Sequence, residues 1–278
     1  VKEGIKRMNR LGLLTPDFSN ALLLGKDNEP KDLVGGSVNG AHRLIPFSGI
    51  PKQPFHIEMA KRIQLLKDLP YDGTQPILLQ GSLLDLQESD SKRPYLPPLD
   101  TSTDVFEWLS SIGKDGILCL LGLRKSIGTD PRGLLPPSSK QLTTAANQQL
   151  HKNEKDYPTR KAKPSLLTVA ARARAKHAHR GGSNSYFGVA TGPESTQNED
   201  AQKLIQQLMD ECVWINIHLF GGMNRSPVVE IRNANGYGAR WAAEWEETNG
   251  ALVPDSVVFR GFLEPQQEDG HKLKWRHS

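Results

Sequence analysis

The segment from Val228 to Trp245 carries charged side chains at spacings that could bring them together. It reads V-V-E-I-R-N-A-N-G-Y-G-A-R-W-A-A-E-W, with an Asn-Gly pair between two short apolar runs. Its polar positions are mostly glutamates and arginines. When such residues gather on one face, the arginines pair with the glutamates or bind anions. Apolar and charged residues alternate with a period of two, which predicts the two strands of a hairpin.

The turn decides which side chains share a face. A two-residue turn at Asn235-Gly236 places Ile231 opposite Arg240 and mixes apolar with charged side chains. A three-residue loop that also includes Tyr237, with the glycine left-handed, pairs Arg232 with Arg240 and leaves the apolar side chains on the other face. We predict the longer loop because it separates the two kinds of residue.

The same alternation in the neighbouring strands collects polar side chains on one face of the sheet. His218 lies on this face and is a candidate acid or base, and His271 is a second candidate near the C-terminus. Arginines directly opposite each other would repel unless a carboxylate or a bound anion lies between them. The predicted binding residues of this face are Asn216, Glu230, Arg232, Arg240, Glu244 and Arg260.

Three interpretations of this face are compatible with the sequence. A solvated face, with its arginines neutralised by Glu230 and Glu244, is the commonest arrangement for an antiparallel sheet. A shallow anion or peptide site would use the arginines as donors. A catalytic face would use His218 and would require a partner that the sequence does not position.

The positive charge is concentrated in one segment of the chain. The net formal charge is +4, but residues 151–180 carry nine Lys and Arg against two Asp and Glu. On a helix, Arg172, Lys176 and Arg180 form one stripe at four-residue spacing. This stripe is either a solvated face or a contact for RNA, DNA or another polyanion, whose binding would weaken as salt rises.

The elements around these residues predict an α+β fold. Periodicity and end signals predict helices at 55–69, at about 104–112, at 166–180, and from Thr196 or Asn198 to the region of Cys212. Short buried strands are predicted at 77–79 and 117–123. Four strands follow at about 213–220, 228–233, 239–245 and 257–263, which predicts a C-terminal module of two helices and a four-stranded antiparallel sheet.

The chain divides into three predicted regions. A loop-rich, mixed α/β N-terminal region spans 1–123, a Pro-, Gln- and Lys-rich linker spans 124–163, and the α+β module spans 164–278. Stretches from the last region, L-T-V-A-A-R-A-R-A-K-H-A-H-R, E-I-R-N-A-N-G-Y-G-A-R-W and F-R-G-F-L-E-P-Q-Q-E-D-G-H-K-L-K-W-R-H, resemble a group of small uncharacterised eukaryotic proteins over about 165–278. The resemblance implies a compact C-terminal module. It implies no activity, cofactor or catalytic residue.

Other signatures are weak. Cys119 and Cys212 each lie in an apolar run, which predicts buried free thiols and a reducing, intracellular compartment, either cytoplasm or nucleus. No histidine pair has helical zinc-site spacing, and we predict no metal and no cofactor. The longest apolar run has eight residues, too few to span a bilayer of about 30 Å.

Our first functional hypothesis is therefore a non-enzymatic protein that binds a protein or anionic partner through the charged sheet face and the basic helix. The alternative is an enzyme acting on a phosphorylated or nucleic-acid substrate, with an arginine clamp and a histidine acid or base. A third is direct RNA or DNA binding by residues 151–180.

Overall fold

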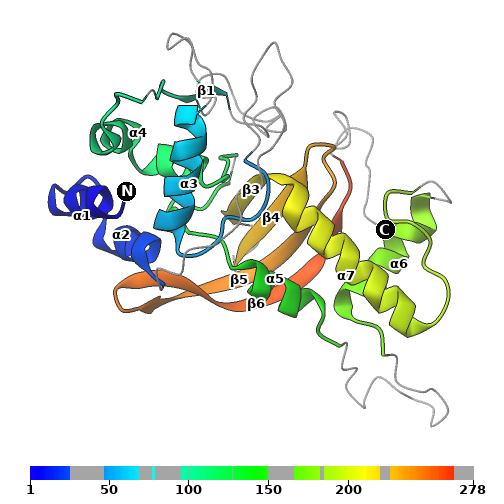
Figure 1. The fold of residues 1–278 in the computed structure, drawn as a ribbon. Coiled ribbons are helices and arrows are strands. Elements are labelled where there is room, and N and C mark those ends of the chain that lie inside the picture. The colour runs from blue at the N-terminus through cyan, green and yellow to red at the C-terminus, as the bar shows by residue number, and fades with distance from the viewer. Residues whose placement is uncertain are drawn as a thin grey trace.

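The protein combines seven helices with a four-stranded antiparallel sheet in the part of the chain that the structure describes (Figure 1). This computed structural model describes residues 1–25, 47–68, 77–78, 95–99, 101–126, 128–149, 166–181, 185–219 and 226–265. The helices are α1 (Lys2–Arg10), α2 (Pro16–Leu23), α3 (Phe55–Asp68), α4 (Val105–Leu120), α5 (Ser139–Ala146), α6 (Val169–Gly181) and α7 (Glu194–Glu211). The strands are β1 (Ile77–Leu78), β2 (Tyr95–Leu96), β3 (Cys212–Leu219), β4 (Pro227–Asn233), β5 (Gly238–Thr248) and β6 (Ala251–Leu263).

The predicted α+β fold of the C-terminal region is confirmed. Strands β3, β4, β5 and β6 pair in chain order, each antiparallel to the next. The last two strands are longer than predicted, because their hairpin continues to a turn at Asn249-Gly250, where both residues have positive φ. The tip of this hairpin packs on α2, where the Asn20 side chain donates to the Gly250 carbonyl oxygen at 3.0 Å.

The β4–β5 turn has the predicted length but begins one residue earlier. The loop is Ala234-Asn235-Gly236, with Gly236 left-handed at φ 83°. Asn233 causes the shift: its Oδ1 accepts the backbone N–H groups of Asn235 and Tyr237, both at 3.1 Å. The turn that the Asn233 side chain stabilises forms in place of the predicted loop. The predicted pairing of Arg232 with Arg240 is wrong, and Glu230 faces Arg240 instead.

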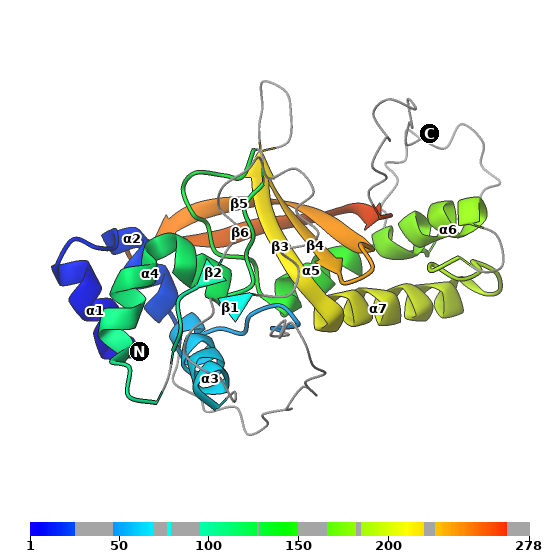
Figure 2. The ribbon, with the colours of Figure 1, turned by 90° about the horizontal axis from the view of Figure 1, so that it is seen from above.

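This shift moves the pairing by two residues, so the predicted faces survive. Helices α5 and α7 cover one face of the sheet (Figures 1 and 2). Trp241 lies on that face, fully buried, and its indole N–H donates to the Leu142 carbonyl oxygen of α5 at 3.1 Å. The other apolar side chains that fill this face are Ile215, Ile217, Val229, Ile231, Ala239, Ala243 and Phe259.

The helix predictions are correct in position and less accurate at their ends. Helix α3 matches the predicted 55–69. Helix α6 begins after Thr168, whose hydroxyl accepts the Ala171 N–H at 3.1 Å, and α7 begins at Glu194, earlier than predicted. The Asn198 side chain accepts a hydrogen bond from the Thr168 backbone N–H and donates one to the Leu166 carbonyl oxygen. These two bonds join the start of α6 to α7.

The predicted strand at 117–123 is wrong. Helix α4 passes through a kink at Gly113 and continues to Leu120. A continuous apolar run does not distinguish a buried strand from a buried helix, and here all sides of the helical end are covered by other elements. Ile117 and Leu120 are fully buried within it.

Part of the predicted linker is ordered and contributes to the core. In residues 128–149, Leu134, Leu135 and Leu142 are buried, and α5 has a complete capping box between Ser138 and Gln141. The division of the chain into three regions stays a prediction. Both cysteines are buried free thiols, as predicted, and burial raises the pKa of Cys212 to about 12. None of the described helices has the length and apolarity that a membrane span requires.

Candidate functional site

Four side chains meet on the sheet face that α5 and α7 do not cover. We call His218, Glu230, Arg232 and Arg240 the charge cluster. Glu230 is its centre: Oε1 accepts Arg232 Nε at 2.7 Å, and Oε2 accepts Arg240 Nη2 at 2.9 Å and Nε at 3.2 Å. His218 Nε2 lies 3.3 Å from the same Oε2. One carboxylate therefore organises two guanidinium groups and one imidazole.

The sheet register brings these residues together. Glu230 on β4 lies directly opposite Arg240 on β5, and on its other side opposite Asn216 on β3. His218 is two residues along β3 from Asn216 and reaches Glu230 diagonally across the pair of strands. Arg232 is two residues along β4, on the same face.

The charge cluster is not the solvated face that is commonest for an antiparallel sheet. Glu230 is 3% exposed and Arg232 is 6% exposed, and Asn216 is fully buried. The side chain of His218 is 17% exposed, and that of Arg240 is 26% exposed. The cluster therefore has a buried side, formed by Glu230 and Arg232, and a side that a ligand can reach, formed by His218 and Arg240.

Glu230 stays ionised at neutral pH. Burial disfavours its charged form, but the hydrogen bond to His218 and the positive charges of Arg232 and Arg240 outweigh burial and lower its pKa from 4.5 to about 2. A carboxylate that binds protons so weakly, and that is already bonded to three side chains, is a poor proton acceptor at neutral pH. Within the cluster, Glu230 instead holds His218, Arg232 and Arg240 in place, and its negative charge offsets the positive charge of the arginines.

The low pKa of Glu230 predicts a loss of stability in acid. Because the folded pKa lies below the unfolded value, its contribution is complete above about pH 4.5 and disappears as the pH falls towards 2, by roughly 3 kcal/mol in total. Urea unfolding of the wild type and of Glu230→Gln at pH 7 and pH 3 measures this contribution. We expect a smaller pH dependence in Glu230→Gln, and an equal dependence in both proteins would contradict the assignment.

The ionised carboxylate also determines the proton position on His218. Glu230 can only accept hydrogen bonds, so His218 Nε2 must carry the hydrogen that lies between them. In the neutral imidazole the proton acceptor is then Nδ1. Carboxylate-oriented histidines of this kind act as general bases in many enzymes.

Arg232 connects the cluster to the turn and to the end of β6. Its Nη1 donates to the Gly236 carbonyl oxygen at 2.6 Å and to the Glu264 carbonyl oxygen at 3.0 Å. The Glu264 carboxylate in turn lies 2.8 Å from Nδ1 of His177 on α6. These contacts hold the Arg232 side chain in place, and they link α6 to the sheet.

Other predicted site residues lie apart from the cluster. Glu244 and Arg260 are exposed, and each lies at a β-bulge of the β5–β6 pair, where the alternation of faces is interrupted. Among the described residues no contact joins either of them to Glu230. On α6, Lys176 is exposed and Arg172 is half-buried, while the side chain of Arg180 and all of His271 lie outside the described residues.

Asn216 holds a segment that sequence reasoning did not connect to the sheet. Its Nδ2 donates to Ser126 Oγ at 2.8 Å and to Thr129 Oγ1 at 3.1 Å. Residues 122–126 and 128–130 run along the outer edge of β3, with Arg124 N donating to Ile215 O at 2.7 Å. The sequence predicts a strand end and a linker here, because these residues have no alternation that would mark them as a sheet edge.

Comparison with known protein families found a match to part of the chain. Residues 157–252 match the CdiA C-terminal tRNase toxin domain. The match covers less than half of the chain, and it includes α6, α7, β3, β4, β5 and the whole charge cluster. Searches of curated proteins and of solved structures found no match.

This match corrects the resemblance drawn from the sequence. The similar family is a bacterial toxin family, and the expected similarity to eukaryotic proteins is not supported. It also favours the nucleic-acid alternatives over the non-enzymatic interaction protein, because the matched domain is named for RNA cleavage.

Proposed function

We propose that this protein is a ribonuclease that cleaves tRNA, with the charge cluster as its catalytic site. The observation that carries the proposal is that residues 157–252, which match a tRNase domain, bring an oriented histidine and a partly exposed arginine together on one carboxylate. The cluster has the acceptor for a proton and the donors for a phosphate. Both are needed for cleavage of RNA by its own ribose hydroxyl.

His218 acts as the general base in this proposal. Its Nδ1 takes the proton of the ribose 2′-hydroxyl while the 2′-oxygen forms a bond to the adjacent phosphorus. The bond from phosphorus to the 5′-oxygen breaks, and the departing oxygen takes a proton from water. The products are a 2′,3′-cyclic phosphate and a 5′-hydroxyl end, and the imidazolium then returns its proton to solvent.

Arg240 binds the reacting phosphate. Negative charge accumulates on the two non-bridging oxygens as the fifth bond to phosphorus forms, and a preorganised guanidinium stabilises that charge. Glu230 holds Arg240 by two bonds to one oxygen, so the guanidinium is oriented before substrate arrives.

Helix α6 adds a second contact for the RNA backbone. Lys176 is exposed on it, and Arg172 is partly exposed. Cations on a helix surface bind phosphates without reading sequence, and each contact releases counterions. The affinity for tRNA should therefore fall steeply with salt.

The test is cleavage of purified tRNA by the full chain, analysed on a denaturing gel and by the chemistry of the new ends. We expect discrete fragments with cyclic phosphate ends. Arg240→Ala should reduce kcat/KM by about 100-fold or more, the effect of removing one charge-stabilising donor. Arg260→Ala is the matched control, since Arg260 is an exposed arginine on the adjacent strand, and it should cleave like the wild type.

Two results would contradict the proposal. One is intact tRNA after prolonged incubation with a chain whose fold is verified by circular dichroism. The other is cleavage by Arg240→Ala at the wild-type rate, which would place the catalytic site elsewhere.

A further inference from the structure

Residues 128–130 form a short extended stretch that pairs with β3 at His218. In the four-stranded sheet β3 has β4 on one side, and across its other side Thr129 and His218 form an antiparallel bridge. The backbone groups of the two residues that flank His218 bond to the two residues that flank Thr129, at 2.8 and 2.9 Å. The backbone at His218 is therefore held from both sides of its strand.

This pairing places the Thr129 side chain next to the imidazole. The two backbone bonds lie on either side of the pair, and in such a non-hydrogen-bonded pair the Cα atoms are only about 4.5 Å apart. Paired residues project to the same face of a sheet, and the Thr129 hydroxyl bonds to Asn216, which lies on that face two residues from His218. The imidazole reaches over β4 to Glu230, so Thr129 occupies its opposite flank.

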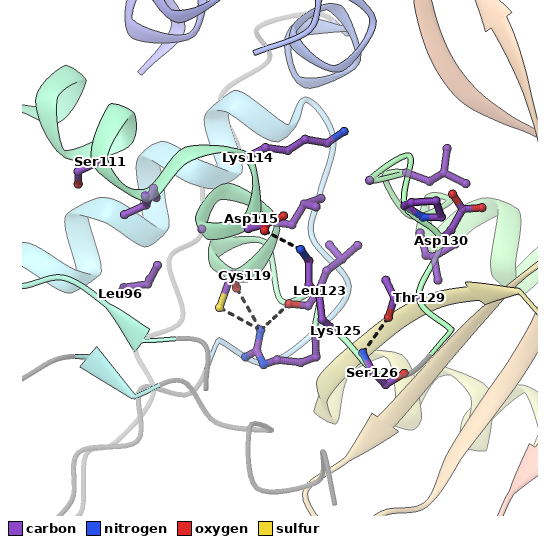
Figure 3. A pocket seen from close by; sticks show the side chains of 18 of the residues that line it. Leu96, Ser111, Lys114, Asp115, Cys119, Leu123, Lys125, Ser126, Thr129 and Asp130 are labelled. Carbon is purple, nitrogen blue, oxygen red and sulfur yellow. Dashed lines mark hydrogen bonds and ion pairs between the residues drawn. The ribbon is translucent and has the colours of Figure 1, made fainter. Parts of the chain in front are cut away.

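Hydrogen bonds around the Asn216 side chain hold Thr129 in this place. Asn216 Nδ2 donates to Ser126 Oγ at 2.8 Å and to Thr129 Oγ1 at 3.1 Å. The Ser126 backbone N–H donates to the same Thr129 oxygen at 2.8 Å (Figure 3). Asn216 is fully buried, so water cannot replace an acceptor that its side chain loses.

A cavity borders this segment. Its volume is about 670 Å³, and Ser126, Thr129 and Asp130 line it together with residues of β2, α4 and β3 (Figure 3). A cavity offers no packing contacts to the atoms that face it, so hydrogen bonds must hold the segment on this side. One end is bonded to Asn216, and at the other end the Asp130 carboxylate accepts two bonds from the Arg132 guanidinium at 3.0 and 2.8 Å.

The contact between His218 and Glu230 leaves the imidazole some freedom to rotate. Nε2 lies 3.3 Å from the carboxylate oxygen, whereas N–H···O bonds are most often about 2.9 Å long. A catalytic group that is misplaced by about 1 Å can lose about 100-fold in rate. A side chain on the other flank of the ring restricts such movement, and Thr129 lies there.

We propose that Thr129 is a positioning residue for His218, and that Asn216 and Ser126 hold Thr129 in place. Thr129 keeps the imidazole against Glu230, so that Nε2 retains the hydrogen and Nδ1 stays turned towards the ribose hydroxyl. Thr129 itself takes no proton and binds no phosphate. This inference rests on the proposed ribonuclease function, and it concerns the rate of the chemical step rather than the binding of RNA.

The first test observes the imidazole directly and without RNA. NMR spectra of the full chain with ¹⁵N-labelled histidine report which ring nitrogen carries the hydrogen, and His218→Ala identifies the His218 signals. At a pH where the imidazole is neutral, we expect the wild type to show one tautomer, with the hydrogen on Nε2.

Two variants of Thr129 separate its hydroxyl from its shape. Thr129→Val keeps the shape but removes an acceptor of Asn216 and Ser126, so we expect a mixture of tautomers or signals broadened by motion. Thr129→Ser keeps the hydroxyl and should restore the wild-type spectrum. Thr143→Val is the matched control, because Thr143 is also half-buried with a bonded hydroxyl but lies on α5.

The second test is tRNA cleavage. We expect Thr129→Val to lower kcat by about 10- to 100-fold with KM nearly unchanged, because the base is misplaced while the groups that bind RNA remain. Thr129→Ser and Thr143→Val should both cleave close to the wild-type rate. A variant that only destabilised the fold would not change the tautomer of the folded protein.

The outcomes separate this inference from the ribonuclease proposal. A changed His218 spectrum in Thr129→Val that Thr129→Ser restores supports the positioning role even if the wild type leaves tRNA intact, in which case the ribonuclease proposal alone fails. If the wild type cleaves tRNA and Thr129→Val has the wild-type spectrum and rate, the positioning role is wrong and the charge cluster stands.

A milder variant decides the question if Thr129→Val does not fold. Ser126→Ala removes one acceptor of Asn216 at a half-buried position and leaves Thr129 unchanged. It should alter the His218 spectrum in the same direction and lower kcat by about threefold or more. A wild-type spectrum and rate in Ser126→Ala would then overturn the inference.

Discussion

Replacement of His218 by alanine is expected to slow tRNA cleavage by roughly 10²- to 10⁴-fold, the range for loss of a positioned acid or base. Alanine has no group to take the proton of the ribose 2′-hydroxyl, while Glu230, Arg232 and Arg240 keep their mutual ion pairs. The rate is measured under single-turnover conditions with enzyme in excess over labelled tRNA, so that product release does not limit it.

Two comparisons identify a chemical role for His218. His179→Ala, at an exposed histidine on α6, should cleave at the wild-type rate. Added imidazole should restore part of the activity of His218→Ala and none to Arg240→Ala, because only the first lacks a proton acceptor. Cleavage by His218→Ala within threefold of the wild type would remove this histidine from the mechanism.

The largest effect on stability is expected from Glu230→Ala. This change leaves Arg232, whose side chain is 8% exposed, without the carboxylate that neutralises it. A buried charge that loses its partner costs about 3 to 5 kcal/mol of unfolding free energy. Urea unfolding at pH 7 measures it, and Glu244→Ala, at an exposed glutamate on β5, should change stability by less than about 0.5 kcal/mol.

A double variant tests whether the unpaired charge is the cause. Glu230→Met combined with Arg232→Met removes both charges and keeps the volume, so it should be more stable than Glu230→Met alone. If the double variant is instead less stable by the sum of the single effects, the two residues are not coupled. Wild-type stability in Glu230→Ala would also refute the structural role of the ion pairs.

The sequence alone was sufficient for the order and type of the C-terminal elements. The two helices and four strands follow from periodicities of 3.6 and two residues, which depend on the local geometry of the backbone. The same period of two placed Glu230, Arg232 and Arg240 on one face, and that placement survives the error in the turn. Local chemistry also explains the error, because the Asn233 side chain closes the loop one residue earlier than an Asn-Gly pair suggests.

Burial, pairing and the cavity required the tertiary structure. Whether Glu230 is solvated or buried depends on what covers the sheet face, and this information does not reside in the alternation of β4. Residues 122–126 and 128–130 and the second half of α4 have apolar or irregular sequences without a distinguishing period, so their packing could not be predicted. The sequence therefore determined which charged residues share a face, and only the folded chain decided which of them meet, because contacts between distant segments depend on register and packing.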